Sequence, residues 1–150
     1  MQFDFSPHKL LAVSHLRFHR LWLSLGVAMI LAVTVVSLID LPEPVKGFVL
    51  HDKLMHTLTY ACLMGWFAQI YRHDLTRLLL MIGLIALGII IEFIQGSTEH
   101  RQFELLDMVA NTSGAVLAWA LAYTWVGGIL AFAERSICNI FKYLHRSVQS

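Results

Sequence analysis

Charged residues are scarce in this sequence. Lys, Arg, Asp and Glu make up 14% of its 150 residues, whereas hydrophobic residues make up 57%. Soluble domains usually carry about 25% charged residues, and a soluble helical bundle needs a polar face on each helix. Two long stretches, 21–39 and 108–133, contain no charged residue at all. This shortage excludes an ordinary soluble domain.

Cysteine and basic clusters are also in short supply. The two cysteines are Cys62, inside an apolar stretch, and Cys138, near the C-terminal end, so no disulfide framework is predicted. The net charge is +1, and no run of lysine or arginine suits the phosphate backbone of a nucleic acid. We therefore expect no nucleic-acid partner.

The chain is rich in long hydrophobic segments. A helix that spans a bilayer needs about 20 predominantly apolar residues. Pro42 and Pro44 forbid a continuous helix between the first two segments. The sequence therefore predicts an all-α, polytopic membrane protein, a four-helix bundle whose transmembrane helices lie within 21–39, 54–71, 78–96 and 108–133.

Two terminal segments flank this predicted transmembrane domain, 21–133. Residues 1–20 and 134–150 mix basic and apolar residues, which is typical of interfacial segments, and the second reads as an amphipathic helix on the inner membrane surface. Together with loop 72–77 they hold eight of the eleven lysines and arginines. Since positive loops stay inside, both termini are predicted to be cytoplasmic.

Polar residues interrupt the apolar segments at regular helical spacing. Ionisable groups inside a membrane are costly and usually functional. The second helix begins at the outer side, the third ends there and the fourth begins there, so their polar residues should lie at one depth. These residues are Asp52, Lys53, His56 and Tyr60, then Glu92 and Gln95, then Asp107 and Asn111, with Arg101 in the loop above.

Small residues accompany these polar groups. Gly114, Ala118 and Ala122 continue the face that carries Asp107 and Asn111. Such small-xxx-small patterns let neighbouring membrane helices approach closely. Gly88 similarly lies one turn before Glu92 on the third helix. The acidic residues are therefore predicted to face tight helix interfaces and not lipid.

The order and spacing of these motifs resemble the VanZ-like family of small integral membrane proteins. The motifs are D-K-x-x-H-x-x-x-Y from Asp52, E-x-x-Q from Glu92, Arg101, and D-x-x-x-N-x-x-G from Asp107, within about residues 36–123. The resemblance implies a multi-pass protein of a bacterial-type inner (cytoplasmic) membrane, related to the cell envelope and to resistance to the glycopeptide antibiotic teicoplanin. It implies no particular reaction. The sequence departs from the family at Thr57, where an aromatic residue is frequent, and at Ala118, where glycine often follows.

Three interpretations of the polar residues stay open. In an enzyme acting on a lipid-linked substrate, His56 would be base or nucleophile, Glu92 the acid, and Asp52 or Asp107 would orient the imidazole. Substrate would then be held by Lys53, Arg101, Tyr60, Gln95 and Asn111, with the two cations on an anionic head group. In a binding or accessory protein the same residues would recognise an envelope lipid or a lipophilic antibiotic without reaction.

The third interpretation is a structural lock. In it Lys53 and Arg101 pair with Glu92 and Asp107 and hold the helices together, with interhelical hydrogen bonds from Asn111 and Gln95. Asp52 and Asp107 also lie at predicted helix starts, where acidic residues favour the helix dipole. No H-x-x-x-H or cysteine pair accompanies His56, so no metal site is predicted. The cofactor and the oligomeric state are left open.

Overall fold

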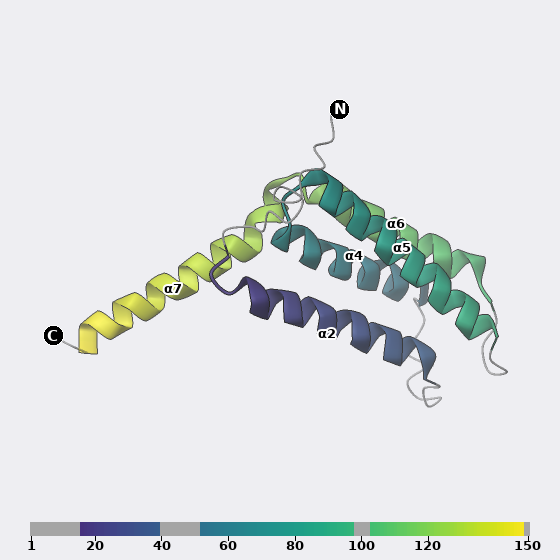
Figure 1. Ribbon diagram of the computed structural model, residues 1–150, viewed down its shortest axis with the longest axis horizontal. Helices are drawn as coiled ribbons and strands as arrows, with labels where there is room; N and C mark the ends of the chain where they lie inside the picture. Colours follow the sequence, from purple (N-terminus) through teal and green to yellow (C-terminus); the bar gives the residue numbers. More distant parts are fainter. Residues whose placement is uncertain (1–15, 40–51, 98–102, 149–150) are drawn as a thin grey trace.

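The computed structural model describes residues 16–39, 52–97 and 103–148, and its regular structure there is helical (Figure 1). The segments predicted to span a membrane form helices, which confirms the all-α class. The elements are α2 (His19–Leu38), α4 (Asp52–Ile70), α5 (Asp74–Gly96), α6 (Leu105–Leu121), the 3-10 helix η1 (Trp125–Gly128) and α7 (Ile129–Val148).

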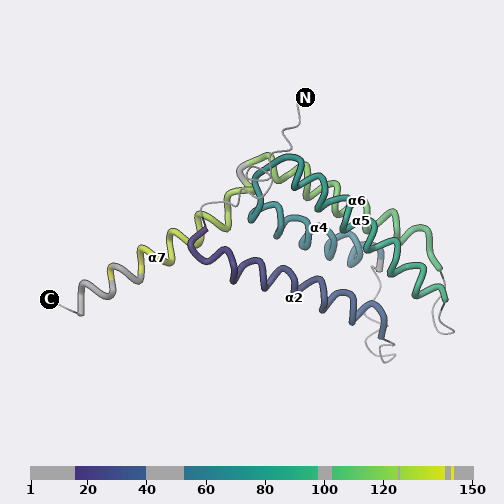
Figure 2. Tube along the Cα trace, in the orientation of Figure 1, coloured from purple at the N-terminus to yellow at the C-terminus, as the bar shows by residue number. Residues whose placement is uncertain are grey.

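Helix α4 is the centre of the bundle. It packs most extensively on α6 and also contacts α2 and α5, which run beside it in Figures 1 and 2. Its buried residues Tyr60, Leu63, Met64 and Ala68 form one core cluster with Leu84 of α5 and small residues of α6. A helix covered by its neighbours needs no uniformly apolar surface, which explains why α4 is the least hydrophobic of the four predicted spans.

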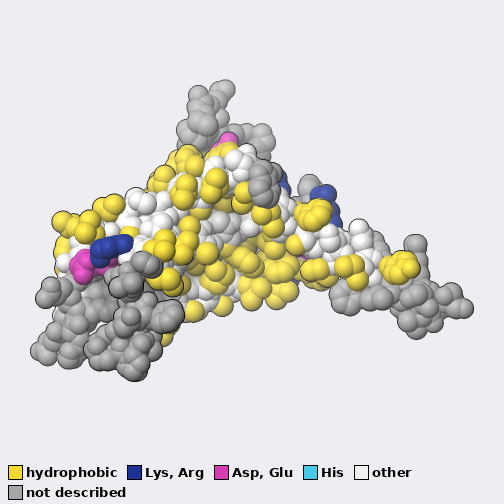
Figure 3. Space-filling model, turned by 180° about the vertical axis from the view of Figure 1, so that it is seen from behind, with side chains coloured by type: hydrophobic (Ala, Val, Ile, Leu, Met, Phe, Trp, Pro, Cys, Tyr) yellow, Lys and Arg dark blue, Asp and Glu magenta, His cyan; other side chains and the backbone are white. Residues whose placement is uncertain are grey.

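Within the described residues, two helices are long and apolar enough to cross a membrane, α2 and α5. Helices α6 and α7 would add a third span only if this pair, bent by 80°, counted as one. Figure 3 shows hydrophobic side chains over the middle of one face of the bundle, with the visible charged side chains toward its ends. The described helices are thus compatible with a membrane-embedded protein, whereas four transmembrane helices are not confirmed.

The predicted fourth span, 108–133, is not one continuous helix. Helix α6 ends at Leu121, and the Thr124 hydroxyl accepts a hydrogen bond from Val126 N at the start of η1. A Cβ atom on Gly127 would lie 2.2 Å from the Ala122 carbonyl oxygen, so the chain turns too tightly there for a larger residue. The amphipathic helix consequently begins at Ile129, five residues before the predicted boundary at 134.

Arg77 connects the C-terminal ends of α4 and α6, which lie at the opposite end of the bundle from the polar residues. Its guanidinium is buried and donates hydrogen bonds to the carbonyl oxygens of Ala68, Tyr71 and Ala122, at 2.7–3.2 Å, and it lies over the Tyr123 ring. The last carbonyls of a helix have no partner within the helix. One arginine therefore supplies that partner for two helices at once.

Candidate functional site

The candidate site lies where α4 and α6 begin and α5 ends. Lys53 Nζ donates to Asp107 Oδ1 at 2.8 Å and to Glu104 Oε2 at 2.6 Å, so one ammonium group bridges the first turn of α6 and the residue that caps it. The hydrogen bond to Asp107 has the largest effect and the one to Glu104 the next largest, and both raise the pKa of Lys53 above its ordinary value. The Lys53 side chain is 43% exposed, and the cluster is therefore open to solvent on one side.

His56 lies one turn further along α4, between two side chains of α6. Its Nδ1 is 3.1 Å from Asn111 Oδ1, and its Nε2 is 3.6 Å from Asp107 Oδ2. Each ring nitrogen thus faces a side-chain oxygen of α6. Asp107 is consequently shared between Lys53 and His56.

Tyr60 and Asn111 close the inner side of this cluster against α5. A Cβ atom on Gly88 would lie 3.0 Å from the Tyr60 hydroxyl and 3.1 Å from Asn111 Nδ2. Gly88, which lies one turn before Glu92 on α5, therefore leaves space for two polar side chains, one from α4 and one from α6. Tyr60 itself is buried.

Glu92 is the most deeply buried charged residue of this end of the bundle. Only 2% of its surface is exposed, and Oε1 accepts a hydrogen bond from the backbone N–H of Glu104 at 2.7 Å. Among the residues that the structure describes, no lysine or arginine forms an ion pair with it. A buried carboxylate without a cation partner is expensive, and this is the least explained charge in the site.

Gln95 connects the site to the remaining helix. Its Nε2 donates to the Ser37 carbonyl oxygen at 2.6 Å, which ties the end of α5 to the end of α2. The structure thus gives Gln95 a helix-to-helix contact of the kind that the structural-lock interpretation assigns to it, while its predicted role in substrate binding stays a prediction.

The structure brings together most of the predicted site residues. Lys53, His56, Asp107 and Asn111 form one connected cluster, and Glu92 reaches it through the backbone of Glu104. Sequence reasoning assigned no role to Glu104, although its place three residues before Asp107 puts both carboxyl groups near the start of one helix. The Asp52 side chain and all of Arg101 lie outside the described residues.

The described cluster has an excess of acidic groups. Three carboxyl groups, those of Glu92, Glu104 and Asp107, accompany the single ammonium of Lys53. Lys53 already donates to two of them, so their negative charges offset its attraction for an anion. In the described part of the chain, no three His, Cys, Asp or Glu side chains form a group that could hold a metal ion.

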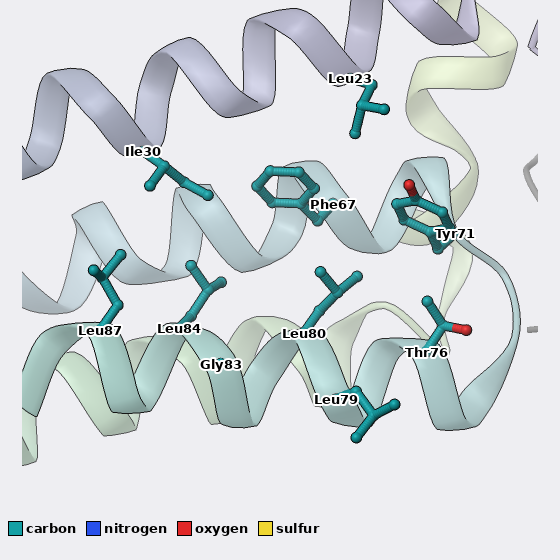
Figure 4. A pocket seen from close by; sticks show the side chains of 10 residues that line it. All are labelled: Leu23, Ile30, Phe67, Tyr71, Thr76, Leu79, Leu80, Gly83, Leu84 and Leu87. Carbon is teal, nitrogen blue, oxygen red and sulfur yellow. The ribbon is translucent and has the colours of Figure 1, made fainter. Parts of the chain in front are cut away.

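A second, apolar groove lies between α2, α4 and α5 (Figure 4). Its volume is about 420 Å³, and hydrocarbon side chains such as Leu23, Phe67 and Leu84 line it. Tyr71 and Thr76 supply the hydroxyl groups at one end of it in Figure 4. The groove contains none of the residues of the polar cluster and offers space for a hydrocarbon chain.

Comparison with protein-family models, curated proteins and solved structures gives no match for this chain. The VanZ-like resemblance therefore stays a prediction.

Proposed function

We propose that this chain is a VanZ-like integral membrane protein that binds the head group of an envelope lipid or a similar amphiphile. The observation that carries the proposal is buried Glu92, which no described cation neutralises. Ionisable residues inside a membrane protein are kept mainly where they have a function. The ion pair between Lys53 and Asp107 does not include Glu92, which contacts α6 only through the backbone N–H of Glu104 among the described hydrogen bonds.

The chemistry of the cluster indicates which part of a head group it recognises. Three carboxyl groups accept hydrogen bonds and attract positive charge, so they favour amino and hydroxyl groups over bare phosphate. Lys53 is predicted from the sequence to hold an anionic head group, but Glu104 and Asp107 compensate its positive charge. A phosphate would have to rely on Arg101, which lies outside the described residues.

The proposal includes an arrangement in a bacterial-type inner membrane. Helices α4 and α6 would span it together with α2 and α5, with both termini cytoplasmic and the polar cluster at the outer face. The 17 residues of α6 give a length of about 25 Å, which is slightly less than the hydrocarbon thickness of about 30 Å. Lys53 and Glu104 would then lie at the outer interface, where exposed charges are tolerated.

Acid–base catalysis on the bound amphiphile is a second candidate function. It is favoured by His56, whose two ring nitrogens lie 3.1 Å from Asn111 Oδ1 and 3.6 Å from Asp107 Oδ2. A carboxylate and an amide that orient an imidazole are typical of a general base. For Nδ1 to take a proton from a substrate, the imidazole proton would have to lie on Nε2, towards Asp107, and the Asn111 oxygen would have to rotate away from Nδ1.

A binding experiment tests the main proposal. Purified protein would be heated in detergent with phosphatidylethanolamine, phosphatidylglycerol or teicoplanin, which differ in amino, phosphate and sugar groups. A ligand that binds the folded state raises the melting temperature by mass action. We expect an amphiphile rich in amino or hydroxyl groups to raise it for the wild type and not for Glu92→Gln.

Two results would count against these functions. If no amphiphile in the panel raises the wild-type melting temperature, the binding proposal is wrong. If mass spectrometry finds every amphiphile unchanged after incubation with the protein, the catalytic candidate is dropped while binding stands. A ligand that stabilises wild type and Glu92→Gln equally would place the binding site elsewhere, for instance in the apolar groove.

A further inference from the structure

Helix α7 leaves the bundle after its first two turns. Its start is held by Leu130 N, which donates to Gln69 Oε1 of α4, and by buried Glu134. The remainder extends away from the other helices in Figures 1 and 2. Ile140 is 58% exposed and Tyr143 is 74% exposed there. Most of a 20-residue helix thus has no protein surface against it within the described chain.

Glu134 fixes the base of this helix to the start of α2. Its Oε1 accepts hydrogen bonds from Arg17 N and Phe18 N, and its Oε2 accepts from Trp22 Nε1 at 2.9 Å. One carboxylate thus binds two backbone N–H groups immediately before α2, beside the helix end where negative charge is favoured by the helix dipole. Helix α7 therefore emerges at the end of an apolar helix that is long enough to cross a membrane.

The direction of α7 places it along a membrane surface. It is bent by 80° from α6, so if α6 crosses the bilayer, α7 runs nearly parallel to the membrane plane. Trp22 and Trp66, which stack edge to face at 5.8 Å, lie near its base. Tryptophan is enriched at membrane interfaces. Two tryptophans at the base of α7 therefore fit a position at the membrane interface.

Charge and hydrophobicity divide α7 into two faces. At helical spacing, Ile137, Ile140, Phe141 and Leu144 fall on one stripe, and the register places the basic residues Arg135, Lys142 and Arg146 on the other side. A helix with this division lies in the interface of a membrane, and its basic residues are attracted to anionic lipid. A second protein surface would need acidic groups beside an apolar groove to match both faces.

We propose that α7 binds the surface of a membrane that contains anionic lipids, through its apolar stripe and its basic residues. The inference goes beyond the proposed head-group site, which lies at the other end of the bundle. It also goes beyond an interfacial location, because it names anionic lipid as the partner and Glu134 as the contact that holds α7 at this depth. Each basic residue near an anionic surface adds attraction, and α7 carries three.

Two neighbouring positions on different faces allow a matched test. Ile140 lies on the apolar stripe and Asn139 does not, and both are exposed in the structure. Ile140→Cys and Asn139→Cys would be made separately in the full chain with Cys62→Ser and Cys138→Ser, and labelled with an environment-sensitive fluorophore. The protein would be placed in nanodiscs of phosphatidylcholine with or without phosphatidylglycerol, which leave both membrane faces open to iodide.

We expect the label at Ile140→Cys to be protected from iodide several-fold more than the label at Asn139→Cys when phosphatidylglycerol is present. Without phosphatidylglycerol, and in the variant Arg135→Gln/Lys142→Gln/Arg146→Gln, this protection should fall. Equal quenching at both positions would overturn the proposal. So would protection that does not depend on phosphatidylglycerol, or energy transfer between labelled copies, which would show that a second chain covers the stripe.

Discussion

The backbones of Gly114 and Thr57 touch. A Cβ atom on Gly114 of α6 would lie 2.0 Å from the carbonyl oxygen of Thr57 and 3.0 Å from the backbone nitrogen of Ala61, both on α4. Backbone atoms cannot rotate out of the way as a side chain can. This contact lies below the polar cluster, and the close approach of α4 and α6 is what brings Lys53 within reach of Asp107.

Gly114→Ala should therefore destabilise the protein strongly. The added methyl group forces α4 and α6 apart, and overpacking of this kind costs about 3 kcal/mol or more where the clash is with backbone. The matched control is Gly65→Ala on α4, since a Cβ atom there meets nothing within 4 Å. Alanine is also the better helix former by about 1 kcal/mol, so the control should be at least as stable as wild type.

Reversible unfolding of the purified variants in mixed micelles measures both effects. Equal stability of Gly114→Ala and Gly65→Ala would show that the two helices are not in backbone contact.

Arg77→Met should also reduce stability, at the other end of the bundle. The substitution leaves the carbonyl oxygens of Ala68, Tyr71 and Ala122 without their donor, and each unsatisfied buried group costs about 1–3 kcal/mol. Arg77→Lys keeps the charge but lacks the planar fork that reaches three oxygens at once. The free energy of unfolding should thus fall in the order wild type, Arg77→Lys, Arg77→Met.

Arg20→Lys, at an exposed position of α2, is the control for this series. If Arg77→Met unfolds at the same denaturant concentration as this control, the buried guanidinium contributes nothing to stability.

The general fold and much of the site follow from patterns in the sequence. Helical spacing alone puts Asp107 and Asn111 on one face, and the predicted alternation in the direction of successive helices places that face at the level of His56. Glycine in a small-residue stripe predicts the contact at Gly114, and the structure confirms it. These features are local or depend only on the order of the helices.

Other features depend on tertiary geometry that no pattern encodes. Arg77 reads as a basic residue of a cytoplasmic loop, and its burial depends on where two helix ends meet. Residues 108–133 contain no charged residue, so the hydropathy pattern does not mark the break, and only the pair Gly127 and Gly128 indicates a turn. Glu104 joins the site through its ion pair with Lys53, which is remote in sequence, and through its backbone bond to Glu92.

Lys53→Met provides a test of the exposed ion pairs. The raised pKa of Lys53 means that the charged amine favours the folded state. This contribution is fully present below the unfolded-state pKa of about 10.4, and it is lost as the pH rises through the higher folded-state value. Since 43% of the side chain is exposed, screening limits the loss in Lys53→Met to about 1 kcal/mol or less.

The difference in unfolding free energy between wild type and Lys53→Met should be constant from about pH 7 to about pH 9 and shrink only above about pH 10.4. It should also shrink in high salt, because exposed charges are screened. A difference that vanishes between neutral pH and about pH 9 would mean that the ammonium group does not hold Glu104 and Asp107 together.

Glu92→Gln separates a functional carboxylate from a structural one. Glutamine retains the side-chain oxygen that accepts the Glu104 N–H bond, and it removes a buried charge that no described cation compensates. Stability should therefore be unchanged or higher, as often happens when a functional group is replaced, while stabilisation by the bound amphiphile disappears. Asp107→Asn is the comparison, because that change breaks the ion pair with Lys53 and weakens the contact with His56.

We expect Asp107→Asn to lose about 1 kcal/mol of stability, in the range of partly exposed ion pairs, and Glu92→Gln to lose none. Thermal unfolding in detergent, with and without the amphiphile, measures both properties on one sample. A large loss of stability in Glu92→Gln would show that its charge holds α5 to the start of α6, and the buried carboxylate would then belong to the helix lock. If Glu92→Gln keeps its stability but is no longer stabilised by the amphiphile, the buried carboxylate serves ligand recognition.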